Sequence, residues 1–314
     1  MCVKMPLPLG RMRLQEELVL GTDFARNVVP RMASLVEKTQ MLVRGVKCST
    51  KNSLSTICIS RLQTLCLLCN AFFDLLQENE GDFPPLPNFK TVRYGHPLWP
   101  FFEHYFAVAT LIPEEELANE VVVISRLQRT SDDVNLSQSA RPMIRPAISC
   151  KVTIESALDC DAHVNFANAF LSGHLFQGAI AQEEILFAMR PELCACAILC
   201  ERMCDDEAVA VTGTRQYSNA IGYGRRVKCQ PLDEPTRHPS TILCIDAQYG
   251  CLGRSKSDMD RDLFKALTAF KGPTVRTVST GRWGCGMFAK HPELTFLQQW
   301  IAASEVIDST IFIL

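Results

Sequence analysis

The feature that most constrains the fold of this chain is an alternation of strand-like and helix-like segments after residue 145. Six short runs rich in β-branched residues are bounded by turn residues, at 148–156, 163–169, 208–214, 241–248, 274–280 and 309–314. Helix-like segments alternate with them, namely EEILFAM, ELCACAILCERM, DLFKALTAF and ELTFLQQWIAAS. Strands that alternate with helices are typical of a sheet covered by helices on both faces. The pattern therefore predicts an α/β fold for residues 146–314.

The preceding part of the chain carries a different pattern, which favours helices. In 54–76 and in 98–112, apolar residues recur at spacings of three and four. The proline-rich stretch NEGDFPPLPNF separates these two segments, and the polar stretch 128–142 is typical of a loop or linker. We predict a helical N-terminal accessory region over residues 1–145, followed by the α/β region over 146–314.

Charge and cysteine content exclude several classes of function. The 314 residues include 32 Lys and Arg against 34 Asp and Glu, so no overall positive field attracts DNA or an anionic membrane. No apolar run approaches the roughly 20 residues that cross a bilayer, and the N-terminus lacks the apolar centre of a signal peptide. The 15 cysteines are therefore expected to be reduced thiols, which favours the nucleus or the cytoplasm.

Cys196, Cys200 and Cys204 recur every four residues and form the most metal-like cysteine pattern. This spacing predicts that they share one face of a helix. Structural zinc usually takes paired C-x-x-C motifs, and the chain has one, Cys66 and Cys69. Because free cysteines often pack in cores, we expect these residues to be apolar core positions and expect no metal.

The stretch 165–185, NFANAFLSGHLFQGAIAQEEI, brings two adjacent carboxylates to the start of a helix. Pro191 ends that helix, so Glu183 and Glu184 fall in its first turn. Acidic residues there interact favourably with the helix dipole, by about 0.3–1 kcal/mol, and need no further function. The small residues upstream, however, let backbone amides approach a phosphate, and carboxylates can cleave glycosidic bonds. On these residues alone, the structural and the catalytic interpretation both remain open.

The order of motifs along the chain resembles that of the poly(ADP-ribose) glycohydrolases. The matching segments are NFAN followed by QEEI, PEL (191–193), VTGTRQYSNAIGYG (211–224), CIDAQ (244–248), STGRWGCGMF (279–288) and QWIAAS (299–304). NAFFDLL (70–76) is similar to the family's accessory region. The resemblance covers most of residues 55–314, in order and with compatible spacing. It implies a macrodomain-like mixed sheet flanked by helices, with a helical N-terminal extension and no metal or organic cofactor.

The resemblance also implies roles for the residues of the NFAN and QEEI motifs. Glu184 would be the acid/base that protonates the ribose–ribose bond and then activates water. Glu183 would hold ribose hydroxyls together with Asn168, and Gln182 opens the helix motif. Asn165 stands where the family has an aspartate. Glu184, Glu183 and Asn165 form the predicted catalytic set.

Two loops would hold the diphosphate of ADP-ribose, according to the same resemblance. Ser172, Gly173 and His174 occupy the first loop, where the family normally has three consecutive glycines. The second loop covers 280–286, with arginine where the family has asparagine. Its predicted binding residues are Gly281, Arg282, Gly284 and Gly286, and Tyr223 would cover the adenine.

A local concentration of positive charge surrounds Tyr223 in the sequence. It consists of Arg215, Arg225, Arg226 and Lys228. These residues are either a solvated loop surface or a contact with the phosphates of neighbouring ADP-ribose units. The sequence leaves both interpretations open.

Two functional hypotheses follow from the sequence. The first is a poly(ADP-ribose) glycohydrolase that shortens the polymer and releases ADP-ribose. We expect it to be a monomer that acts on poly(ADP-ribose) and ADP-ribosylated proteins in the nucleus or cytoplasm, in the response to DNA damage. The alternative is a catalytically weakened or inactive protein that binds ADP-ribose or its polymer, which Asn165 and the Ser172–Gly173–His174 loop favour.

Overall fold

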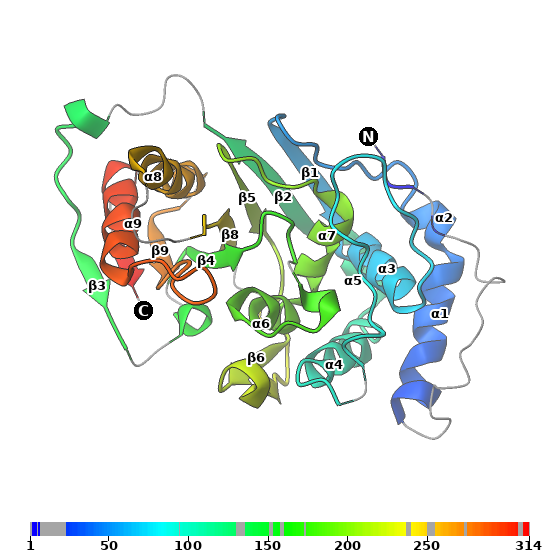
Figure 1. Cartoon of the computed structure of the whole chain (residues 1–314). Helices are drawn as coiled ribbons and strands as arrows, with labels where there is room; N and C mark the ends of the chain where they lie inside the picture. Colours follow the sequence, from blue (N-terminus) through cyan, green and yellow to red (C-terminus); the bar gives the residue numbers. More distant parts are fainter. Residues whose placement is uncertain are drawn as a thin grey trace.

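The computed structural model describes residues 2–4, 6, 23–93, 95–129, 136–150, 153–157, 160–172, 174–236, 240–249, 255–272, 275–306 and 310–313. A mixed sheet of eight strands runs through this part of the chain, in the spatial order β1-β2-β5-β8-β4-β9-β10-β3 (Figure 1). The strands are β1 (Ser55–Ser60), β2 (Val121–Gln128), β3 (Pro146–Ile148), β4 (Ala162–Ala167), β5 (Glu207–Thr212), β8 (Thr241–Asp246), β9 (Thr277–Thr280) and β10 (Thr310–Ile313). β1, β2, β5 and β8 pair antiparallel, whereas β8, β4, β9, β10 and β3 pair parallel.

Helices cover both faces of the sheet and pack against alternate residues of the same strands. In β5, Val209 and Val211 belong to one buried cluster, while Ala208 and Ala210 belong to a second. The first cluster includes α3 (Arg61–Phe72), α4 (Trp99–Ala109), α6 (Gln182–Met189) and α7 (Cys196–Leu199). The second includes α8 (Lys256–Phe270) and α9 (Pro292–Val306). The predicted sheet with helices on both faces is thus confirmed.

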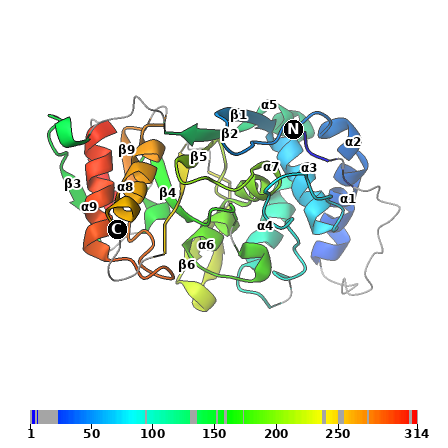
Figure 2. The same ribbon diagram turned by 45° about the horizontal axis from the view of Figure 1, so that its top comes forward.

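The remaining elements are short. A two-stranded antiparallel hairpin pairs β6 (Ser218–Ile221) with β7 (Lys228–Pro231). The other helical segments are α1 (Val29–Glu37), α2 (Thr39–Leu42), α5 (Glu114–Asn119), a π-helical η2 (Phe24–Val28), and the 3₁₀ turns η3 (Leu136–Gln138), η4 (Ile154–Ser156), η5 (Leu175–Gln177), η6 (Pro191–Ala195) and η7 (Gly224–Arg226). Figure 2 shows α1, α2 and α3 at one end of the molecule and α8 and α9 at the other. None of the described helices has the length and apolarity needed to span a membrane.

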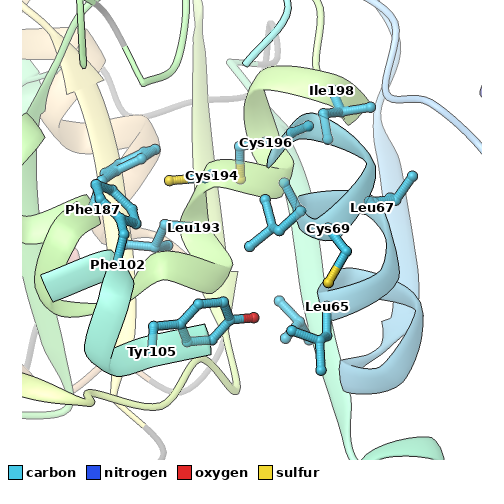
Figure 3. Close-up of a cluster of buried hydrophobic side chains, with 14 of the residues drawn as sticks. Leu65, Leu67, Cys69, Phe102, Tyr105, Phe187, Leu193, Cys194, Cys196 and Ile198 are labelled. Carbon is cyan, nitrogen blue, oxygen red and sulfur yellow. The ribbon is translucent and has the colours of Figure 1, made fainter. Parts of the chain in front are cut away.

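The N-terminal helices share a hydrophobic core with the helices that follow β4. Figure 3 shows this cluster, with Leu65, Leu67 and Cys69 of α3, Phe102 and Tyr105 of α4, Phe187 of α6, Leu193 and Cys194 of η6, and Cys196 and Ile198 of α7. All ten side chains are buried. Because large apolar side chains are removed from water on both sides of this contact, the N-terminal helices stabilise the position of α6.

The helical prediction for 54–76 is wrong for its first part, because β1 occupies Ser55–Ser60 and only then does α3 begin. The Ser60 side chain accepts a hydrogen bond from the Gln63 amide, and Gln63 Oε1 accepts one from the Ser60 amide. This capping box starts the helix at Arg61. Because β1 and β2 precede residue 146 and belong to the main sheet, the boundary expected near residue 145 does not coincide with an edge of that sheet.

Two further local predictions differ from the structure. The strand expected over 148–156 is a short β3 at Pro146–Ile148 and a separate 3₁₀ turn at Ile154–Ser156, with 151–152 outside the described residues. The helix expected to carry Cys196, Cys200 and Cys204 ends at Leu199, so these three cysteines do not share a helix face. Cys196 and Cys200 are nevertheless buried, as expected of core cysteines.

Candidate active site

A cleft of about 850 Å³ opens at the carboxyl ends of the parallel strands β4, β8 and β9. Phe166, Ala167 and Asn168 line it from the end of β4, Ala247 from the end of β8, and 281–288 from the segment after β9. The start of α6 and the turn at 223–225 complete the wall. Ligands of open α/β sheets bind at this edge because loops from several strands converge there.

The structure brings most of the predicted site residues together around this one cleft. Those that line it are Asn168, His174, Gln182, Glu183, Glu184, Tyr223, Gly281, Arg282, Gly284 and Gly286. Asn165 and Ser172 do not line it and are buried. Gly173 lies outside the described residues.

Glu184 sits in the first turn of α6, 4% exposed, with its carboxyl group in the wall of the cleft. Its Oε2 accepts a hydrogen bond of 2.7 Å from the Ala181 amide, which precedes the helix. Ala181 has no side-chain acceptor, so the Glu184 carboxylate takes over part of the capping of this helix end. The carboxyl group is therefore fixed in one orientation beside the cleft.

Glu183 is 3% exposed and accepts hydrogen bonds from three donors of the protein itself. Oε1 accepts from Asn165 Nδ2 and from the Ser172 amide, both at 3.2 Å, and Oε2 accepts from the Asn168 amide at 3.0 Å. Burial, together with the neighbouring charge of Glu184, raises the pKa of Glu183 to about 8. Glu183 thus connects the segment after β4 to α6. The predicted contact of Glu183 with ribose hydroxyls stays a prediction.

Asn165 lies behind Glu183, fully buried in the middle of β4. Its Nδ2 donates to Glu183 Oε1 and lies 3.5 Å from Cys244 Sγ, while its Oδ1 has no hydrogen-bond partner among the described residues. An amide can donate to Glu183, which an ionised aspartate at this position could not do. Asn165 therefore supports Glu183 from behind rather than facing the cleft.

The first loop, 168–178, is held by its own backbone and side chains. Asn168 Oδ1 accepts from the Phe170 amide at 3.0 Å, and Ser172 has a left-handed backbone with φ of 70°. The family's glycine suits such a conformation better than serine does. The exposed His174 ring lies 2.8 Å from Gln177 Oε1, so it is tied to its own loop at the rim of the cleft.

Gln182 connects α6 to β4 through its side-chain amide. Its Oε1 accepts from the Phe166 amide at 2.9 Å, and its Nε2 donates to Glu155 Oε1 at 2.8 Å. Tyr223 is 63% exposed and lines the cleft beside α6, where a planar ring can cover a ligand. Partial burial raises the pKa of Tyr223, and the charges of Glu184 and Glu155 raise it further.

The second loop, 281–288, is glycine-rich and has unused backbone donors. Gly284 has a φ of 73°, and a Cβ there would lie 2.4 Å from Lys290 Cδ and 2.7 Å from Ala247 Cβ. The amides of Gly284, Gly286 and Met287 donate to no acceptor within the described ranges. Successive free amides in a concave turn form a site for an anion such as a phosphate oxygen.

Comparison with known proteins identifies the family to which the chain belongs. A family model described as poly(ADP-ribose) glycohydrolase with a Macro domain fold matches residues 133–314. The chain belongs to this family. The match confirms both the resemblance seen in the sequence and the macrodomain-like fold.

Relatives with curated descriptions match about half of the chain. Poly(ADP-ribose) glycohydrolase 1 of Caenorhabditis elegans is 31% identical over 178 residues, which covers 49% of this chain and 23% of the relative. Probable poly(ADP-ribose) glycohydrolase 2 of Arabidopsis thaliana is 26% identical over 216 residues, 52% of this chain and 41% of the relative. The chain therefore spans less than half the length of these relatives.

Solved structures of bacterial members of the family are similar to this chain at lower identity. Poly(ADP-ribose) glycohydrolase from Thermomonospora curvata is 19% identical with a TM-score of 0.43, covering 60% of this chain and 73% of that one. The enzyme from Deinococcus radiodurans, in complex with ADP-ribose, is 18% identical with a TM-score of 0.41, covering 55% and 79%.

Sequence reasoning missed the residues that hold the second loop of this family member in place. Trp283 is fully buried and donates from Nε1 to the Ile245 carbonyl at 3.0 Å. Lys290 Nζ lies 4.1 Å from the centre of the Trp283 ring and 2.9 Å from Asp262 Oδ2. The signal available in the sequence was the position of Lys290, two residues after the end of the STGRWGCGMF motif.

The basic cluster expected around Tyr223 divides into two parts. Arg215 is 4% exposed and pairs with Glu116 and Glu120, so it belongs to the interior. Arg225 lines the cleft, and Lys228 is exposed. Among the described residues, no group of three or more His, Cys, Asp and Glu side chains is arranged to hold a metal ion.

Proposed function

We propose that this chain hydrolyses the ribose–ribose glycosidic bonds of poly(ADP-ribose) and releases ADP-ribose. The observation that carries the proposal is the position of Glu184, a buried carboxyl group fixed by the Ala181 amide in the wall of the cleft. The glycine-rich second loop lines the same cleft and offers free amides. A carboxyl group and an anion site facing one cavity suit a phosphorylated sugar substrate.

The proposed reaction uses Glu184 twice. In the first step its carboxyl proton passes to the leaving ribose oxygen while the bond from that oxygen to the anomeric carbon breaks. In the second step the carboxylate removes a proton from water, and the water oxygen bonds to the same carbon. The proton returns to Glu184, so the enzyme is regenerated and one water is consumed per bond. The bond to Ala181 keeps the carboxyl group in position through both steps.

The second loop supports the proposal by giving the diphosphate a place to bind. The free amides of Gly284, Gly286 and Met287 are backbone donors, and Arg282 adds a cation in the same wall. Local donors of this kind can hold a diphosphate although the chain carries a net charge of −2. This fits the wider proposal that the protein acts as a monomer on poly(ADP-ribose) and ADP-ribosylated proteins, in the nucleus or cytoplasm, after DNA damage.

The direct test is release of ADP-ribose from labelled polymer by the wild-type chain and by Glu184→Gln. We expect the substitution to lower the rate by about 10²–10⁴-fold, because glutamine can neither give nor take the proton. Glu115→Gln is the matched control, since Glu115 is an exposed glutamate in the first turn of α5. Equal rates for the wild type and Glu184→Gln contradict the assignment of Glu184, and no release by the wild type contradicts the hydrolase.

The second candidate function is an ADP-ribose-binding protein without turnover. It is favoured by Asn165, which puts a neutral amide where the family has a carboxylate, and by the left-handed Ser172. Calorimetry with ADP-ribose separates the two functions. Binding by a wild type that has no turnover, retained in Glu184→Gln, supports the binding protein, whereas no binding at all rules out both.

A further inference from the structure

A second hollow of about 400 Å³ lies next to the cleft, between the start of α4 and the β6–β7 hairpin. Its main lining residues are His96, Trp99, Pro100, Val227, Lys228 and Cys229. Figures 1 and 2 both show α4 beside the hairpin. The volume lies within the range of small-ligand sites.

The hollow and the cleft share a wall. Leu98 donates its amide to His96 Nδ1 at 3.2 Å, which leaves the hydrogen on Nε2. His96 Nε2 then donates to the Gly178 carbonyl at 3.2 Å, and Gly178 lines the cleft. On the other side, Arg225 lines the cleft and Val227 lines the hollow, two residues further along the chain. One extended ligand can therefore reach from the first cavity into the second.

The rim between the two cavities carries the positive charge of Arg225 and Lys228. Within the described part of the chain, Arg225, Arg226 and Lys228 take part in no ion pair. Arg226 and Lys228 are exposed, and Lys228 lines the hollow. Unpaired cations attract an anion such as a phosphate group.

Trp99 is a partly buried aromatic residue that lines the hollow. Its ring centre lies 5.5 Å from that of Phe24, edge to face, and 6.3 Å from that of Phe72. These contacts fix the indole, while the side that lines the hollow is available to a ligand. A fixed indole beside a cation suits a purine base that is linked to a phosphate.

We propose that this hollow binds the neighbouring ADP-ribose unit of the polymer, with the adenine on Trp99 and the diphosphate near Lys228. The inference rests on the proposed function of the cleft, which takes the unit to be released. It adds that the substrate is held through two consecutive units. The protein therefore binds an oligomer more tightly than a single ADP-ribose.

The test compares binding of ADP-ribose with binding of a two-unit ADP-ribose oligomer, by calorimetry on the full chain carrying Glu184→Gln to prevent cleavage. We expect the oligomer to bind at least about tenfold more tightly. In Lys228→Ala the advantage should shrink and the slope of log affinity against log salt should fall by about 0.7 per lost phosphate contact. In Trp99→Leu the affinity advantage of the oligomer over ADP-ribose should shrink by about 5- to 100-fold, as expected for the loss of one stacked base. The affinity for ADP-ribose should be unchanged in both variants.

Lys47→Ala is the control, because Lys47 is an exposed lysine outside both cavities. Trp99→Leu also touches the core, so Lys228→Ala decides the matter if the tryptophan variant does not fold. Equal affinities for the two ligands overturn the second site and leave the hydrolase intact. If Lys228→Ala loses as much affinity for ADP-ribose as for the two-unit oligomer, the second site is also overturned. The second site is likewise overturned if an oligoadenylate RNA binds through Lys228 as tightly as the ADP-ribose oligomer does. If neither ligand binds, both the hydrolase and the second site are overturned. If the wild type binds both ligands but does not cleave the polymer, only the hydrolase is overturned.

Discussion

The two walls of the cleft are organised by different buried groups, a carboxyl group in the first and a cation in the second. In the first wall, 166–184, the carboxyl group of Glu183 collects donors from Asn165, Asn168 and Ser172. In the second wall, 281–288, the cation of Lys290 lies over Trp283 and pairs with Asp262. Each wall is thus held by a buried group, of which Glu183 lines the cleft and Lys290 does not.

The two walls also differ in how some of their backbone amides are used. The amides of Asn168 and Ser172 already donate to Glu183. In the second wall the amides of Gly284, Gly286 and Met287 have no acceptor among the described residues. The second loop therefore offers amides for the proposed diphosphate contact, whereas those of Asn168 and Ser172 in the first loop are occupied. Glycine content alone does not identify a phosphate-binding loop, because the acceptors already present matter as much.

The largest expected effect comes from filling the space at Gly284. In Gly284→Ala the new methyl group would lie within 3 Å of Lys290 and Ala247, at a φ of 73° that alanine adopts only at a cost. Overpacking and the left-handed backbone together should lower the free energy of unfolding by about 3 kcal/mol. Urea denaturation measures this, and calorimetry should show weaker binding of ADP-ribose.

Gly286→Ala is the matched control for Gly284→Ala. Gly286 lies in the same loop, but its φ is outside the left-handed range and a Cβ there would meet no atom within 4 Å. We expect its free energy of unfolding to stay within about 0.5 kcal/mol of the wild type. Equal destabilisation by the two substitutions would mean that Lys290 does not fix the second wall.

The next effect tests the first wall, through Asn165→Asp. Aspartate restores the residue that the family carries, but its carboxylate cannot donate to the buried Glu183 Oε1. Two carboxyl groups in contact must keep a proton, so the free energy of unfolding should fall by about 2 kcal/mol at pH 8 and by less at pH 6. Thermal or urea unfolding at the two pH values measures the difference.

The control for this substitution is the double variant Asn165→Asp with Glu183→Gln. Glutamine can donate to the new aspartate, so part of the lost stability should return. Because Asn165 does not line the cleft, the single substitution should not raise the rate of polymer cleavage. A large gain in rate would show that the amide at this position is the reason for weak activity.

The sequence predicted the site better than the elements that support it. Motif order placed Asn168, Glu184 and Tyr223 around one cleft, as the structure has them. It failed for β1, because STICIS continues without a break into α3 and shares its apolar spacing of three and four residues. Only the pairing with β2, more than 60 residues further on, makes this segment a strand. Local periodicity cannot contain that information.

The same limit explains why the burial of two cations was not predicted. Arg215 was expected either at a solvated loop surface or at a phosphate contact, and Lys290 lies outside the motifs recognised in the sequence. Arg215 is buried because Glu116 and Glu120 approach it from a segment about 100 residues earlier. Lys290 is buried because α8 brings Asp262 to it. Such partners come from tertiary packing, so residue type and spacing could not predict the burial of these charges.

A smaller expected effect is the change of stability and of ADP-ribose affinity with pH, which tests the first wall. The pKa of Glu183 is raised to about 8 in the folded protein, from an ordinary value of 4.5. Between these values the folded state keeps a proton that the unfolded state has lost, so stability should fall as pH rises from about 4.5 to about 8. Above pH 8 Glu183 is ionised and the first wall gains a negative charge. Because this charge repels the phosphates of ADP-ribose across a partly solvated cleft by about 1 kcal/mol, the affinity for ADP-ribose should fall about fivefold.

Calorimetry of ADP-ribose binding between pH 6 and pH 9 measures this change. In Glu183→Gln the fall in affinity near pH 8 should disappear, since the group that titrates is gone. Glu115→Gln, on the exposed surface of α5, should leave it unchanged. A wild-type affinity that is constant across the range would mean that Glu183 stays ionised, with its three donors outweighing its burial.

The smallest effect concerns the backbone of the first loop. Ser172 has a φ of 70° and is buried, with its amide bonded to Glu183. Ser172→Gly removes about 1–2 kcal/mol of left-handed strain but adds flexibility to the unfolded chain, so the free energy of unfolding should rise by about 0.5–1 kcal/mol. Ser172→Ala keeps the strained φ and should not gain. If both variants lose stability alike, the serine hydroxyl contributes more to the free energy of unfolding than the strained backbone costs. The serine at this position would then stabilise the loop of this chain.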